Sequence, residues 1–207
     1  GATPENTEQL SQLKNLKGCC GIKLFAGSST GNLLVDKEAD IEKVISKADR
    51  IVSIHSEDEE ILNLRKKFIK KGDVHSHPEW RNTETAISST RRVVKIAERY
   101  NKKIHVLHVT TKEEVDFLAM HKKNVTFETT PQHLTFYAPD CYDKLGTYAQ
   151  MNPPIRTKDH YDRLWAAIKN NVVDVLGSDH APHTKENKQK VYPDSPSGMP
   201  GVQTIFP

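Results

Sequence analysis

The chain has 207 residues and a net charge of +3, from 30 basic and 27 acidic residues spread along its length. Hydrophobic residues make up 36% of it and charged residues 28%, a balance typical of a globular protein and not of a disordered one. The near-neutral charge gives no reason to expect a nucleic-acid or membrane partner. No apolar run approaches the roughly 20 residues that a membrane-spanning helix needs, and the first residues lack the features of a signal peptide.

The elements follow one another as alternating short apolar runs and longer amphipathic ones. Strands are predicted at 19–25, 50–55, 103–109, 124–128 and 172–176. Helices with apolar residues at a spacing of three to four are predicted at 37–47, 57–70, 84–100, 112–121 and 158–170. This repeated strand–helix order favours a single α/β domain with a parallel sheet.

Three segments are predicted to be loops. The Gly- and Ser-rich segment 26–32 follows the first strand. The segment 130–157 carries five prolines or glycines, and a loop of that length is usually functional or disordered. The tail 184–207 is rich in Pro, Gly and Lys. Cys19, Cys20 and Cys141 do not form a disulfide framework, which indicates a reducing, cytoplasmic setting.

Polar side chains stand at the carboxyl ends of the predicted strands. They are Lys23, His55, His108, Glu128 and Asp179. Strand ends of parallel α/β folds converge on the active site. Imidazole and carboxylate groups suit zinc, with manganese or cobalt as alternatives. A lysine among them fits a metal site only if it pairs with a carboxylate or has become one.

Each residue alone also has a plain structural explanation. A histidine at a strand end is often a hydrogen-bonded polar residue, Lys23 could be an ion-pair partner, and Asp179 could cap a turn. A plain α/β scaffold without chemistry would need all of these types to coincide at separate strand ends. The coincidence favours a metal site.

Several motifs together resemble the dihydroorotases of the amidohydrolase superfamily, especially the bacterial ones. The motifs are GIKLF at 21–25, IHSED at 54–58, LHVTT at 107–111, TPQHL at 130–134, MNPPIR at 151–156 and GSDHAPH at 177–183. They occur in the order that the family has and extend over nearly the whole chain. The resemblance implies a zinc-dependent (β/α)8 TIM-like barrel.

The resemblance also implies a role for particular residues. Lys23 would carry carbon dioxide as a carbamate and bridge two Zn²⁺ ions, and His55 and His108 would bind the second ion. Asp179 would bind the first ion and act as the general base that passes a proton to the leaving amide nitrogen. Asn152 and His183 would bind substrate, and the turn 198–201 (GMPG) would offer backbone groups to its ring.

The implied reaction is the reversible interconversion of L-dihydroorotate and N-carbamoyl-L-aspartate in pyrimidine biosynthesis. The resemblance further implies a small-molecule substrate and a homodimer. A hydantoinase or allantoinase is the nearest alternative, because these enzymes share the lysine, histidines and aspartate. A non-catalytic relative that assembles with a transcarbamoylase is another.

One family motif has no counterpart at the expected place. A His-x-His-x-Arg should precede Lys23, and residues 1–22 do not contain it. His75 and His77 form a His-x-His, but they follow His55 and come after the charged run 66–73, so we expect them in a solvated or capping loop. Residues 1–207 are therefore expected to be the C-terminal part of the barrel, about strands four to eight, without the flanking β-sandwich. We expect this part alone to be poorly stable and inactive.

Overall fold

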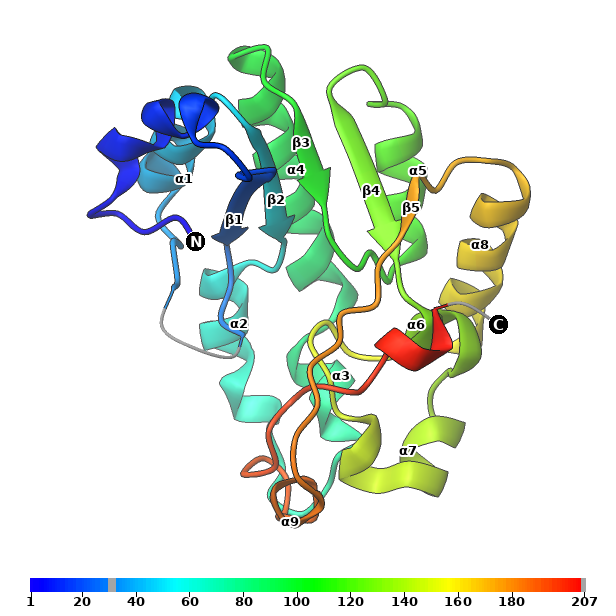
Figure 1. Cartoon of the computed structure of the whole chain (residues 1–207). Coiled ribbons are helices and arrows are strands. Elements are labelled where there is room, and N and C mark those ends of the chain that lie inside the picture. Colours follow the sequence, from blue (N-terminus) through cyan, green and yellow to red (C-terminus); the bar gives the residue numbers. More distant parts are fainter. Residues whose placement is uncertain (30–32, 206–207) are drawn as a thin grey trace.

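The computed structural model describes residues 1–29 and 33–205, and its centre is a five-stranded parallel sheet (Figure 1). The strands are β1 (Gly21–Phe25), β2 (Ile51–His55), β3 (Ile104–Val106), β4 (Val125–Thr129) and β5 (Val175–Leu176). They pair in sequence order, β1-β2-β3-β4-β5, and every pair is parallel. The five predicted strands and the parallel sheet are confirmed.

The helices form a layer along the sheet (Figure 1). The four that connect or flank the strands are α1 (Glu38–Lys47), α4 (Thr83–Arg99), α5 (Lys112–Ala119) and α8 (Lys158–Lys169), and each packs against the next. A strand order without reversal puts right-handed crossovers on the same side of the sheet. The structure is therefore singly wound, as in a (β/α)8 barrel, and not doubly wound.

Shorter helices lie beyond the strand ends and in the connections. They are α2 (Glu59–Arg65), α3 (Ser76–Trp80), α6 (Pro131–Thr135), α7 (Asp140–Leu145) and α9 (Lys185–Lys188), with 3-10 turns η1 (Thr7–Asn15), η2 (Lys66–Phe68), η3 (Gly146–Ala149) and η4 (Val202–Thr204). Their caps are mostly local: the side chains of Asp58 and Thr130 accept backbone N–H groups at the start of α2 and α6. Within residues 1–29 and 33–205, no helix has the length and apolar character needed to cross a membrane.

Alternate residues of each strand face the helices and form the main core. The side chains of Leu24, Val52, Ile54, Ile104 and Phe127 are fully buried there. Because successive side chains of a strand point to opposite faces, the residues between them lie on the other face. Lys23, Ser53, His105 and Thr126 are register partners across β1 to β4 and form a polar row on that face.

Several predicted boundaries were wrong. The strand predicted at 103–109 ends at Val106, and His108 adopts a positive φ of 38° beyond it. The strand predicted at 172–176 contains only Val175 and Leu176, since the N–H of Val172 bonds to the end of α8. The helix predicted at 57–70 begins at Glu59, because Asp58 caps it.

The predicted loops are also more ordered than expected. Segment 130–157 contains α6, α7 and η3, because capping by Thr130 and the fixed φ of Pro131 start a short helix that sequence periodicity cannot reveal. The tail contains α9 and η4. In the predicted loop 26–32, residues 30–32 lie outside the described residues, as do residues 206 and 207 of the tail.

Candidate active site

Two histidines from neighbouring strands meet at the carboxyl end of the sheet. His55 ends β2 and His108 follows β3, and both side chains are almost completely buried. Nδ1 of His55 lies 3.0 Å from Nε2 of His108, with the rings edge to face. Burial lowers the pKa of both rings, so both are neutral at pH 7.

A buried carboxylate sets the tautomer of His55. Nε2 of His55 lies 3.0 Å from Oε2 of Glu57, which also pairs with the guanidinium of Arg81 at 3.2 Å. Burial opposes ionisation of Glu57, but Arg81 and the hydrogen bond from His55 outweigh it and lower the pKa of Glu57 to about 2. Because the ionised carboxylate only accepts, His55 carries its proton on Nε2 and presents the lone pair of Nδ1 to His108.

Lys23 lies on the polar face of β1 and interacts electrostatically with two carboxylates, those of Asp179 and Glu128. Burial lowers the pKa of Lys23 to about 8, although both carboxylates act in the other direction. Glu128 is held by Nε2 of His105 at 3.1 Å. A Cβ at Gly177 would lie 2.3 to 2.6 Å from the Glu128 carboxylate, so this approach requires glycine at that position.

Asp179 follows β5 and adopts a positive φ of 39°, which an aspartate tolerates better than most residues. Its carboxylate lies within electrostatic range of the Lys23 and His55 side chains. Burial raises the pKa of Asp179, and His55 and Lys23 offset part of that increase. Of the four residues predicted to hold metal, the structure places His55 and His108 in direct contact and Lys23 and Asp179 within electrostatic range of them.

The nitrogen atoms of the histidine pair are suited to a metal ion. If Nε2 of His108 also presents its lone pair, two lone pairs face each other at 3.0 Å, an arrangement that a cation stabilises. Nδ1 of His108 is buried and has no hydrogen-bond partner among the described residues. Within residues 1–29 and 33–205, no three His, Cys, Asp or Glu side chains lie close enough to hold an ion. His55 and His108 therefore fit as two of the ligands of a metal site.

Asn152 is held in place by residues of distant segments. Its Oδ1 accepts from Nε2 of His77 at 3.1 Å, and the same nitrogen lies 3.0 Å from the carbonyl of Met151. Nε2 of His133 donates to the carbonyl of Pro153 at 3.1 Å, and His133 also interacts electrostatically with His108.

The expectation for the His-x-His motif was wrong for one of its histidines. The side chain of His77 is completely buried, and burial lowers its pKa to about 3. His75 is 42% exposed and pairs with Asp143 at 3.2 Å. Sequence could not show that His77 packs against residues 74 positions away. Both histidines lie near α3 and neither is on a strand, as expected.

His183 and the turn 198–201 contact each other. Nε2 of His183 donates to the carbonyl of Ser197 at 3.1 Å. Gly198 has a φ of 142°, and a Cβ there would lie 2.5 Å from the carbonyl oxygen of Ala181, so only glycine fits. The N–H of Gly198 already donates to the carbonyl of Gln150. This turn therefore places His183 beside the segment that carries Asn152.

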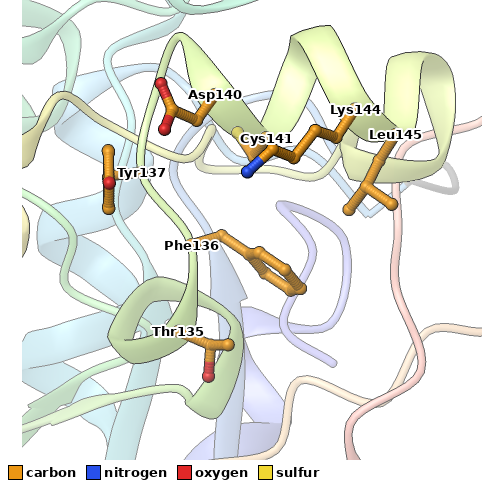
Figure 2. A pocket seen from close by; sticks show the side chains of 7 residues that line it. All are labelled: Thr135, Phe136, Tyr137, Asp140, Cys141, Lys144 and Leu145. Carbon is orange, nitrogen blue, oxygen red and sulfur yellow. The ribbon is translucent and has the colours of Figure 1, made fainter.

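A separate pocket of about 270 Å³ lies between α7 and the segment that precedes it. Figure 2 shows the side chains of Asp140, Cys141, Lys144 and Leu145 on one side of it and Thr135 and Phe136 on the other. None of the strand-end residues lines this pocket. The chemistry of the strand ends and this cavity are therefore distinct features.

The sequence predicted Glu128 at a strand end, without a role. It did not predict a role for Glu57, Arg81 or His133. A signal existed for Glu57, which stands two residues after a strand-end histidine. No local signal existed for Arg81, because its carboxylate partner lies 24 positions earlier in the chain.

The chain is similar to part of several dihydroorotases. It is 33% identical over 187 residues to the dihydroorotase of Halobacterium salinarum, with 89% of this chain and 43% of that protein covered. It is 31% identical over 221 residues to that of Methanosarcina mazei, covering 100% and 48%, and 32% identical over 206 residues to that of Brevibacillus brevis, covering 94% and 48%. The chain spans less than half the length of each of these relatives. No protein-family model matches it.

Solved structures share the fold. The L-hydantoinase (dihydropyrimidinase) of Arthrobacter aurescens matches 99% of this chain with 48% of its own, at a TM-score of 0.91 and 22% identity. The dihydropyrimidinase of Brevibacillus agri matches 98% with 47% of its own, at a TM-score of 0.85 and 25% identity. The fold is therefore that of part of a cyclic amidohydrolase barrel.

Proposed function

Since the chain is a homologue of the dihydroorotases, we propose that it forms the catalytic strand ends of a zinc-dependent dihydroorotase. The reaction is the reversible hydrolysis of L-dihydroorotate to N-carbamoyl-L-aspartate, a step of pyrimidine biosynthesis. The observation that carries the proposal is the pair of neutral, buried imidazoles of His55 and His108 beside Lys23 and Asp179.

Lys23 has the properties that carbamate formation requires. An amine reacts with carbon dioxide only when it is unprotonated, and a pKa of about 8 leaves roughly a tenth of the amine neutral at pH 7. A carbamate on Lys23 would add a negative charge next to Asp179 and Glu128, and cations would balance that charge. Lys23, His55, His108 and Asp179 are thus the residues of this chain that would hold two Zn²⁺ ions. Such ions, when bound, activate water and polarise a carbonyl group.

Asp179 is the proposed general base. The attacking water transfers a proton to its carboxylate as the oxygen bonds to the ring carbonyl carbon. The carbon–nitrogen bond then breaks, and Asp179 returns the proton to the leaving nitrogen. A carboxylate whose pKa is raised by burial is a better base than an exposed one, and so suits this transfer.

The residues proposed to bind substrate lie on two neighbouring segments. Asn152 and His183 offer an amide and an imidazole, which suit the polar ring edge and the carboxylate of dihydroorotate. Glu57 and Arg81 position His55, and their role is to keep Nδ1 unprotonated. We further propose a homodimer located in the cytoplasm. The three free cysteines are consistent with the reducing conditions of that compartment.

The experiment is turnover by the full-length gene product. L-Dihydroorotate and N-carbamoyl-L-aspartate should both be converted, with hydantoin and allantoin at least about a hundredfold slower in kcat/KM. Metal analysis should give two zinc ions per chain, and mass spectrometry of the native protein should show carbon dioxide on Lys23. Preference for hydantoin or allantoin would overturn the substrate assignment, and an inactive, metal-free protein would support the non-catalytic alternative.

The 207 residues by themselves are proposed to be inactive. His55 and His108 are two candidate metal ligands. Among the described residues, no group of three His, Cys, Asp or Glu side chains lies close enough together to hold an ion. The purified 207-residue chain should therefore show no turnover under conditions in which the full-length gene product is active. Measurable turnover by the 207-residue chain would contradict this part of the proposal.

A further inference from the structure

One buried lysine lies outside the strand-end cluster. Lys188 ends α9 and its side chain is almost completely buried. Its Nζ donates to three backbone carbonyls, those of Gln150 at 3.0 Å, Pro196 at 2.9 Å and Gly198 at 3.1 Å. An ammonium group has three N–H donors, so these three carbonyls match its full capacity.

The three carbonyls belong to two segments. Gln150 lies on the segment that carries Asn152 and precedes it by two positions. Pro196 and Gly198 flank Ser197, whose carbonyl accepts the hydrogen bond from His183. The Lys188 ammonium therefore joins the Asn152 segment to the segment 196–198, to which the side chain of His183 is hydrogen-bonded.

Other hydrogen bonds fix the same point. The N–H of Gly198 donates to the carbonyl of Gln150 at 2.9 Å, and the Gln150 side chain donates to the carbonyl of Ser195 at 2.8 Å. The backbone carbonyl of Lys188 accepts from the hydroxyl groups of Thr147 and Ser195. Both ends of the Lys188 residue are thus anchored to the segments that it joins.

The charge of Lys188 has no acidic partner among the described residues. Burial alone lowers its pKa to about 8. Removing an ammonium from water without a carboxylate partner is costly, and an apolar side chain would avoid that cost. The hydrogen bonds to the carbonyls explain why a lysine occupies this position, since no apolar residue could join the two segments.

We propose that Lys188 is a positioning residue that holds Asn152 and His183 at a fixed separation for substrate binding. The inference rests on the proposed function for the identity of the substrate, but the connection between the segments is a property of the chain alone. Lys188 does not touch the reacting atoms, so its loss should impair substrate binding more than the chemical step.

The first test is amide hydrogen exchange on the full-length gene product without substrate. In Lys188→Met, the amide of Gly198, which bonds to the carbonyl of Gln150 across the joined segments, should exchange at least about tenfold faster. The amide of Ala181, which bonds to the carbonyl of Met199 next to Gly198, should also exchange at least about tenfold faster. Lys185→Met, an exposed position on the same helix, is the matched control and should leave these rates unchanged. Unchanged exchange in Lys188→Met would overturn the proposal.

A second measurement uses the unsubstituted chain, in case Lys188→Met does not fold. Above about pH 8 the neutral amine has only two donors for three carbonyls. Protection of the Gly198 and Ala181 amides, corrected for the intrinsic rate, should therefore fall between pH 7 and 9.5, while the β2 amides stay protected. Constant protection of Gly198 and Ala181 would count against the proposal.

The other titratable groups on the surrounding segments and on Lys188's own segment are Tyr148, His183, Lys185, Glu186, Lys190, Tyr192 and Asp194.

The third test is kinetic and uses the full-length gene product with L-dihydroorotate. Lys188→Met should raise KM about tenfold and leave kcat within about threefold, whereas a general loss of folded protein would lower kcat and leave KM unchanged. A fall in kcat with KM unchanged would overturn the positioning role. If the protein does not act on dihydroorotate at all, the proposed function fails while the exchange experiments still decide whether Lys188 joins the segments.

Discussion

The two faces of the sheet are built from alternate residues of the same strands, yet they differ in composition and role. The face toward the helices consists of aliphatic and aromatic side chains that are completely buried, such as Leu24, Ile54 and Phe127. The opposite face carries Lys23, His105 and other polar groups, and burial lowers the pKa of Lys23. Of two residues adjacent in a strand, one therefore contributes to the stability of the core and the other to the polar site.

The apolar face therefore supplies the stability that the polar face lacks. Buried charged and polar groups cost free energy unless they are paired, and the apolar face supplies the compensating burial. Substitutions on the apolar face should consequently change the free energy of unfolding, whereas substitutions on the polar face should change activity or metal binding.

The largest expected effect is on catalysis. Asp179→Asn in the full-length gene product should lower kcat about 10³-fold or more, because the amide cannot accept the proton. The free energy of unfolding should change little, since Asp179 is only partly buried. Asp162→Asn, exposed on α8, is the control and should retain full activity. Turnover by Asp179→Asn within tenfold of the unsubstituted enzyme would refute its role as base.

A neighbouring pair on β1 tests the two faces directly. Leu24→Ala should lower the free energy of unfolding of the full-length gene product by about 3 kcal/mol, because it leaves a cavity in the core. Lys23→Met should be neutral or stabilising by comparison, since it removes a buried ammonium. Urea denaturation measures both. Equal destabilisation by the two substitutions would show that the faces are not separate.

The tautomer of His55 offers a test within the polar face. Glu57→Gln in the full-length gene product should weaken zinc binding by about 10- to 100-fold, because the charged acceptor for Nε2 is lost. Competition with a chelator measures the affinity. Glu114→Gln is the matched control: this buried carboxylate accepts from Thr90 and Thr111 and not from His55. An equal loss of affinity in both variants would indicate general destabilisation.

The last prediction concerns the pH dependence of stability. His77 has a pKa of about 3 in the folded chain, whereas an unfolded histidine has about 6.5. Its contribution to stability is complete above pH 6.5 and is lost as the pH falls towards 3, at about 1.4 kcal/mol per pH unit in between. His77→Gln should therefore reduce proton uptake on unfolding at pH 5 by about one proton. The same proton uptake in His77→Gln and the unsubstituted chain would refute burial of a neutral His77.

Hydrophobic periodicity was sufficient to predict the five strands and the main helices, because that signal is local. It also placed His55, His108 and Asp179 at or just beyond strand ends, and parallel pairing then brings such ends together. The prediction was wrong for Lys23, which lies in the middle of β1 because the strand continues to Phe25. Element boundaries were less predictable. The end of β3 depends on a positive φ at His108 and the start of α2 on capping by Asp58, and both are decided by hydrogen bonds rather than by periodicity.

The sequence by itself therefore determined the order of the elements, the parallel α/β class and the residues at the strand ends. Only the tertiary structure decided which groups support those residues. Arg81 orients Glu57, His77 holds Asn152, and Lys188 joins two segments. Each of these contacts joins residues that lie between 24 and 75 positions apart. A buried polar group is stable only where its partner lies within hydrogen-bond distance, and chain folding, not local sequence, sets that distance.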